Sequence, residues 1–215
     1  MRVFAIIAAA VLWPATGQAQ KTPDFRPRAQ GFLFLPVALD APVFNGLTDV
    51  LGQVDASISF PLHKGLGIGA GANHTWYELN ERALAPEWTI GSVNRLLLYG
   101  KLSWGRYTGP RSFYELNAKV GQAIWDWKCG TCPDSRRQAD LGWGLNAAYF
   151  IHATDNLAFG ISVGYHRDMS EFGPGVIGLD RFPGRTDTGG PYRFFNVGLG
   201  FSTGFQRSPQ GEQGW

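Results

Sequence analysis

The segment LGIGAGANHTWY, residues 66–77, decides the fold. Its even-numbered positions, from Leu66 to Trp76, are mostly apolar, whereas its odd-numbered positions, from Gly67 to Tyr77, are mostly glycine or polar. An alternation with a period of two puts these two sets on opposite faces of a β-strand. A helix would mix the two sets, and each glycine would destabilise it by about 1 kcal/mol relative to alanine. The segment therefore predicts a strand with one apolar face and one small or polar face.

The same alternation marks further segments of the chain. Together with residues 66–77, they predict eight strands, at 31–39, 53–62, 66–77, 94–104, 114–124, 141–151, 157–165 and 195–205. The first is apolar on both faces, so the pattern does not assign its inward side. In the others, one face is apolar and the opposite face is mostly glycine, polar or charged.

The connections between the predicted strands differ in length in a regular way. Three are short turns, at 63–65, 107–112 and 152–156, and the others are long, at 40–51, 78–92, 126–138 and 167–192. Short periplasmic turns and long extracellular loops are typical of transmembrane β-barrels. The pattern predicts an all-β fold, an eight-stranded antiparallel up-and-down transmembrane β-barrel over residues 31–205. An even strand number puts a lead at 20–30 and a tail at 206–215 in the periplasm.

The composition fits this class of protein. The chain has 215 residues, of which 29 are glycine, 14% are aromatic and only 17% are charged. Mean hydropathy is −0.13, far below that of a helical membrane protein. A membrane barrel explains both values, because only every second strand residue faces lipid. The net charge of +2 favours neither nucleic acid nor a strongly charged partner.

The N-terminus has the features of a secretory signal peptide over residues 1–19. Arg2 supplies the positive start, and an apolar run follows from Val3 to Trp13. That run is too short to span a bilayer as a helix. Gly17 and Ala19 have the spacing of a cleavage site, so we expect export and cleavage near Ala19.

Beyond these patterns, the chain resembles the small eight-stranded outer-membrane β-barrel superfamily, which includes the OmpA membrane domain and OmpX. The resemblance covers residues 31–205 and rests on architecture. The last predicted strand lies within FFNVGLGFSTGF, residues 194–205, whose alternation ends in an aromatic residue. This segment is similar to the terminal strand recognised by the barrel-assembly machinery, although ten residues follow Phe205. The resemblance implies an outer-membrane location, with outer-membrane lipid and lipopolysaccharide as neighbours.

The predicted inward faces carry charges. An eight-stranded barrel has an interior that side chains fill, so buried charges there must be paired. We favour an internal ion-pair network over a solute pathway, formed by Asp55, Arg95, Lys101, Glu115 and Lys119. Aromatic residues near both strand ends, including Phe113, Trp125 and Trp127, are expected to form the two interfacial girdles.

Two cysteines, Cys129 and Cys132, lie in a Cys-Gly-Thr-Cys run within a predicted loop. A small disulfide or two free thiols fit this run better than a metal site, because no further ligands stand nearby in the sequence. We expect no cofactor.

An enzymatic role has a weak candidate. A lipid A deacylase needs a serine nucleophile, a histidine base and an acid. His166, Ser170 and Glu171 are the nearest set in this sequence. The segment from His166 to Ser170 reads His-Arg-Asp-Met-Ser, however, whereas the deacylase family has His-x-Ser. His74 is an isolated second candidate. A soluble lipocalin-like barrel is a further alternative, but its inward residues would be apolar.

The preferred function is therefore a non-enzymatic structural or surface-interaction scaffold that acts through its loops. The long predicted loop at 167–192 is the first candidate for a binding surface. Arginines in the predicted loops are candidates to meet lipopolysaccharide phosphates: Arg136, Arg137, Arg181 and Arg185.

Overall fold

The computed structural model of the chain describes residues 26–39, 42–80, 91–129, 136–173 and 190–205. The predicted signal peptide and the tail at 206–215 lie outside these residues, as do Cys132, Arg181 and Arg185. Among the described residues, none of the helices has both the length and the apolar character needed to cross a membrane.

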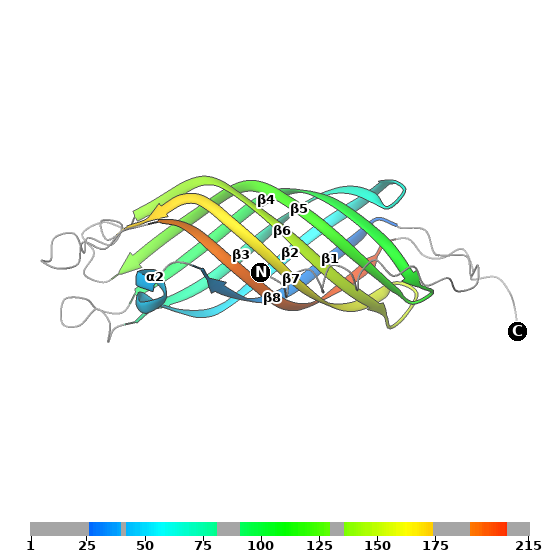
Figure 1. Cartoon of the computed structure of the whole chain (residues 1–215), viewed down its shortest axis with the longest axis horizontal. Helices are drawn as coiled ribbons and strands as arrows, with labels where there is room; N and C mark the ends of the chain where they lie inside the picture. Colours follow the sequence, from blue (N-terminus) through cyan, green and yellow to red (C-terminus); the bar gives the residue numbers. More distant parts are fainter. Residues whose placement is uncertain (1–25, 40–41, 81–90, 130–135, 174–189, 206–215) are drawn as a thin grey trace, which may run out of the picture.

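Eight antiparallel strands form one closed barrel in the order β1 to β8 (Figure 1). The strands are β1 (Arg28–Ala38), β2 (Thr48–His63), β3 (Leu66–Leu79), β4 (Gly91–Gly109), β5 (Ser112–Cys129), β6 (Arg136–His152), β7 (Leu157–Phe172) and β8 (Gly190–Gly204). One short helix, α2 (Pro42–Leu47), stands between β1 and β2. The predicted fold class, an eight-stranded up-and-down barrel, is confirmed.

The two ends of the barrel differ. At one end, β2, β4 and β6 are each joined to the next strand by two to four residues, and the φ angles of 46° at Lys64 and 84° at Gly65 mark the tightest of these turns. We call this the short-turn end. The opposite end, which carries α2 and the longer connections, is the long-connection end (Figure 1). The barrel closes where β1 pairs with β8, from Arg28 opposite Gly204 to Ala38 opposite Phe194.

Most strands extend further toward the long-connection end than the alternation predicted. β7 runs to Phe172 rather than to residue 165, and β5 runs to Cys129. β1 begins at Arg28, three residues earlier than expected, and α2 lies within the segment predicted as a loop at 40–51. On β5, β7 and β8, these extensions carry mostly polar or aromatic residues on the inward face, such as Trp127, Asp168 and Tyr192, and the apolar alternation gives no signal there.

The two faces of the strands have the predicted orientation. On β2, Asp55 and Ser57 are buried inside the barrel while Val54 and Ile58 are exposed outside. The most exposed apolar side chains are on the outer surface, with Leu33, Leu35 and Leu199 each 67% exposed. A band of this kind matches the lipid-facing surface of a transmembrane barrel.

Inward glycines leave room for large inward side chains. A β-carbon at Gly71 would lie 2.6 Å from the Tyr99 hydroxyl, and one at Gly198 would lie 2.4 Å from the Phe34 ring. Three aromatic residues assigned to the interfacial girdles also point inward, and that assignment was wrong: Phe113, Trp125 and Trp127 are buried. They fill the barrel because their odd positions on β5 share the inward face with Glu115 and Ala123.

Candidate functional site

Two aromatic clusters and two polar networks fill the interior of the barrel. The first aromatic cluster contains Phe32, Phe113 and Phe150. The Phe113 and Phe150 rings stack with their centroids 4.8 Å apart. The polar networks adjoin this cluster, and a second aromatic layer lies at the long-connection end.

The first polar network is centred on Glu115, which is fully buried. Its carboxylate forms an ion pair with Arg28 and accepts a hydrogen bond from Gln30 at 3.1 Å. Lys101 lies 3.4 Å from the other carboxylate oxygen and donates to Gln30 at 2.5 Å and to Ser57 at 3.2 Å. Two cations therefore face a single carboxylate, and neutral polar groups complete the contacts of Lys101.

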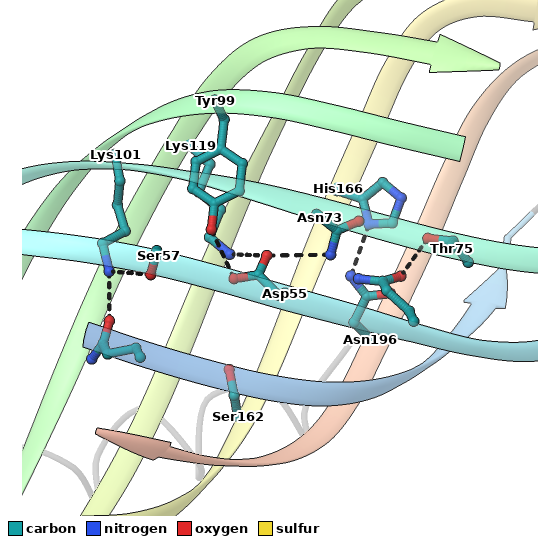
Figure 2. A network of polar contacts seen from close by, with 12 residues as sticks. Asp55, Ser57, Asn73, Thr75, Tyr99, Lys101, Lys119, Ser162, His166 and Asn196 are labelled. Carbon is teal, nitrogen blue, oxygen red and sulfur yellow. Dashed lines mark hydrogen bonds and ion pairs between the residues drawn. The ribbon is translucent and has the colours of Figure 1, made fainter. Parts of the chain in front are cut away.

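The second polar network is longer and crosses the barrel. The Asp55 carboxylate forms an ion pair with Lys119 at 2.9 Å and accepts hydrogen bonds from Tyr99 at 2.7 Å and Asn73 at 3.2 Å (Figure 2). The other side of the Asn73 amide accepts a bond from Arg95 at 2.8 Å. Asn73 thus connects an acid on one side to a guanidinium on the other.

Arg95 ends this network in a bidentate ion pair. Its Nε and Nη2 donate to the two carboxylate oxygens of Asp168 at 2.6 and 2.8 Å. Trp125 donates its indole N–H to the same carboxylate at 2.9 Å. Both charged groups are almost completely buried, and bidentate contacts of this type are stronger and more specific in geometry than single hydrogen bonds between neutral groups.

The aromatic layer at the long-connection end is built around Phe44 of α2. The Phe44 ring is 1% exposed and meets six other rings edge-on, at centroid distances from 5.3 to 6.1 Å. These rings belong to Tyr77, Trp125, Trp127, Phe172, Tyr192 and Phe194. We call this group the Phe44 cluster. Trp125 joins this cluster to the polar network, because its ring stacks on Tyr192 with centroids 4.1 Å apart while its indole N–H donates to Asp168.

A small cavity remains between these groups. It lies among Arg95, His166 and Asn196 and measures about 20 Å³. A volume of this size holds about one water molecule. The arrangement thus holds charges in fixed pairs across the lumen.

All five charged residues predicted for the lumen lie inside the barrel, in these two networks. The networks also contain residues that the sequence analysis left out of them. Arg28 and Gln30 were assigned to the periplasmic lead and Asp168 to a loop, and Tyr99 was left out although it lies on the polar face of the predicted strand 94–104. A signal existed for Asp168, because it continues the even-numbered inward positions of β7.

The residues of the candidate deacylase do not assemble into a catalytic site. His166 and Ser170 are both buried and point into the lumen, whereas Glu171 is exposed. The Nδ1 atom of His166 accepts a hydrogen bond from the Asn196 amide at 2.8 Å (Figure 2). The Ser170 hydroxyl has no hydrogen-bond partner in the described part of the chain. His74 points outward instead, with its ring 4.2 Å from that of Trp76.

The structure describes only some of the other predicted site residues. Cys129 ends β5, and its predicted partner Cys132 lies outside the described residues. Within residues 26–39, 42–80, 91–129, 136–173 and 190–205, no group of three or more potential metal ligands is found. Arg137 is exposed on β6.

Comparison with known proteins bears on the fold. No protein-family model and no curated protein matches the chain. Among solved structures, Neisserial surface protein A matches with a TM-score of 0.53 and 11% identity, over 83% of this chain and 97% of that chain. Ail of Yersinia pestis, solved with the heparin analogue sucrose octasulfate, matches with a TM-score of 0.45 and 7% identity, over 83% and 99% of the two chains.

The outer membrane protease OmpT from Escherichia coli also matches, with a TM-score of 0.40 and 10% identity, over 86% of this chain and 99% of that chain. At identities this low, likeness shows the fold alone. The match to Neisserial surface protein A confirms that the chain has the fold of the small outer-membrane β-barrels, as the resemblance in the sequence indicated.

Proposed function

We propose that this chain is a non-conducting, non-enzymatic scaffold of the outer membrane, with a structural or surface-interaction role carried by its long-connection end. The observation that supports this is the filled lumen. Buried ion pairs and the Phe44 cluster occupy the interior that a pore would need. Loops on a rigid scaffold are the usual place for binding surfaces.

The surroundings of this scaffold follow from its outer surface. The exposed apolar side chains of the strands form a band suited to lipid. In this proposal, outer-membrane lipid and lipopolysaccharide surround the barrel, and the barrel-assembly machinery inserts it after a signal peptide is removed near Ala19. The long-connection end then faces the outside of the cell.

Conductance tests the non-conducting part of the proposal. Planar-bilayer recordings of the refolded full-length chain are expected to show no stable, porin-sized steps, because the lumen cavity beside Arg95 holds about one water molecule. An eight-stranded barrel is just wide enough for side chains to fill. Stable steps of porin size from the wild-type chain would reject this function.

Lipid A analysis tests the non-enzymatic part. We expect the acylation of lipid A, measured by mass spectrometry of cells that make the protein, to be the same for the wild type, His166→Ala and Ser170→Ala. The supporting observation is that Glu171 lies outside the barrel while His166 and Ser170 lie inside it. A change in acylation by the wild-type chain that either substitution abolishes, with the barrel still folded, would replace the scaffold with an enzyme.

A further inference from the structure

The outer surface of β7 and β8 has an ordered sequence of side chains toward the long-connection end. Directly opposed residues of the two strands form the rows Ile161 and Leu199, Val163 and Val197, Tyr165 and Phe195, and Arg167 and Arg193. The surface therefore passes from aliphatic to aromatic to basic in consecutive rows. This order matches the depth profile of a membrane leaflet, with acyl chains below and charged headgroups above.

Beside these rows, the seam between β1 and β2 opens. The two strands pair from Arg28 opposite Ser59 to Phe34 opposite Gln53, and not beyond. β1 nevertheless continues to Ala38 along β8, and β2 continues toward Thr48 along β3. A bulge between Val50 and Gly52 turns β2 away at this level. The half of the seam nearer the long-connection end is thus unpaired.

The sequence of β1 fits an unpaired edge. The Leu39 N–H donates to the Arg193 carbonyl on β8 at 2.8 Å. The backbone N–H and C=O groups of successive residues point to alternate sides of a strand. Because those of Leu39 point toward β8, the backbone groups of Pro36 and Ala38 point toward the open seam. Proline has no N–H to leave unsatisfied, and the Ala38 carbonyl accepts a hydrogen bond from the Asn45 side chain at 3.3 Å. The sequence of β1 is therefore compatible with an unpaired edge at this part of the barrel wall.

A groove of about 730 Å³ lies over this seam on the outer surface. It is lined mostly by apolar side chains of five adjacent strands, among them Leu35, Leu51, Val54, Trp76 and Val197. A β-carbon at Gly52 would meet no atom within 4 Å, so the groove is open there. Its walls include the two aliphatic rows of β7 and β8, and the arginine row lies about 13 Å further along the strands.

The arginine row supplies the charge that complements a phosphate. Arg167 and Arg193 stand directly opposite one another at outward-facing positions of their strands, and both side chains are half-buried. The Nε atom of Arg167 has no hydrogen-bond partner in the described part of the chain. Trp143 lies opposite Arg167 on β6, and its ring contacts that of Tyr165 at 5.6 Å, which adds an interfacial aromatic pair below the charges. Guanidinium groups bind phosphate oxygens in bidentate geometry.

We propose that this face of β7, β8, β1 and β2 binds one phosphorylated lipid of the surrounding leaflet. Arg167 and Arg193 bind a headgroup phosphate, and the groove over the open seam holds an acyl chain. This inference rests on the proposed location of the barrel in the outer membrane, and it names the chemistry of one lipid that the scaffold retains.

Native mass spectrometry of the full-length chain in detergent tests the site. The probes are hexa-acylated bisphosphoryl lipid A and the same lipid with both phosphates removed. We expect the wild type to bind the phosphorylated form at least tenfold more tightly, and Arg167→Gln with Arg193→Gln to lose that tenfold preference. The matched control pair is Arg106→Gln with Arg111→Gln, which changes two exposed arginines at the short-turn end and is expected to stay within twofold of the wild type.

A second variant tests the groove separately. Leu35→Trp fills the groove and is expected to weaken binding of both lipid forms at least fivefold, whereas Leu102→Trp, on the outer face of β4, has no such effect. Equal binding of the two lipid forms by the wild type would overturn the proposal, as would equal losses in the arginine pair and its control. If lipid binding fails these tests while the wild type remains folded and silent in planar bilayers, only this inference is lost. Porin-sized conductance would instead reject the scaffold function itself.

Discussion

The middle of the barrel and its long-connection end are both closed, but by different interactions. In the middle, the closing groups are charges with specific partners, such as Arg95 with both oxygens of Asp168. At the end, the closing group is one aromatic side chain, Phe44, that six rings surround. The first arrangement depends on every partner being present, whereas the second depends on shape and area.

This difference has consequences for how each region tolerates change. A buried charge that loses its partner keeps its desolvation cost and has no neighbour to replace the lost contact. An aromatic cluster can readjust around a missing ring, because dispersion contacts are not directional. The middle of the barrel should therefore be the more sensitive of the two regions to a single substitution.

Arg95→Met has the largest expected effect. It leaves the Trp125 indole as the remaining hydrogen-bond donor to the Asp168 carboxylate within this network of described residues, and it should lower the free energy of unfolding by about 3–5 kcal/mol. Urea unfolding in phospholipid vesicles, followed by heat-modifiable gel migration, measures this. The double variant with Asp168→Leu removes both charges and should recover part of the loss. A loss that is additive in the double variant would mean that the pair has no coupling.

Phe44→Ala tests the aromatic end. The expected loss is about 3 kcal/mol, the low end for buried phenylalanine, because α2 stands at the rim and can readjust. Phe60→Ala is the control, since Phe60 is 47% exposed on the outer surface of β2 and contacts none of this cluster. A loss greater than that of Arg95→Met would reverse the comparison and make the cluster the main determinant of stability.

Gly71→Val sharpens the comparison within the polar region. The new β-carbon would lie 2.5 Å from the Ala56 carbonyl oxygen and 2.6 Å from the Tyr99 hydroxyl, which must then leave Asp55. Overpacking of this kind costs about 1–3 kcal/mol. Gly100→Val is the matched control on the outward face, where the nearest atom is 3.9 Å away. The same unfolding assay should separate the two glycines, and equal stabilities would show that Tyr99 moves freely.

Thr48→Val has the smallest expected effect. It removes the hydrogen bond from the Thr48 hydroxyl to the Phe44 carbonyl, at 2.8 Å, and should cost about 1 kcal/mol. Amide exchange of residues 44–47 is expected to accelerate while the strands of the barrel keep their protection. Exchange that accelerates across the barrel strands instead would show that α2 is coupled to the whole wall.

The alternation of residue types was enough to predict the strands and their faces, because each strand faces the interior of the barrel on one side only. The same alternation also predicts that the side chains of Trp125 and Trp127 point inward, as the structure shows. Ile124 belongs to the outward set, so odd neighbours on β5 must point inward. The girdle assignment placed these two residues outward and disregarded the alternation, although an aromatic residue near a strand end can lie on either face of the strand.

Other features of the site had no local signal. α2 has six residues, too few for a helical period to show, so Phe44 could not be distinguished from a loop residue. The sequence pattern also does not predict which charged side chains pair with one another inside the barrel. Arg28 and Glu115 are 87 residues apart in the chain, and their contact depends on the stagger and tilt of strands that the sequence pattern does not specify.

The pairing of β1 with β8 also bears on how the chain reaches its native state. Eleven residues of the first strand find their partners in the last strand, so the ring of hydrogen bonds cannot close until the end of the chain is available. Until then, both terminal strands present unpaired edges, which are templates for aggregation. Contacts of such large sequence separation also make folding slow. The chain therefore exposes the unpaired edges of β1 and β8 until the barrel closes. The amount of folded protein in the cell then depends on how well these edges are protected from aggregation before they pair.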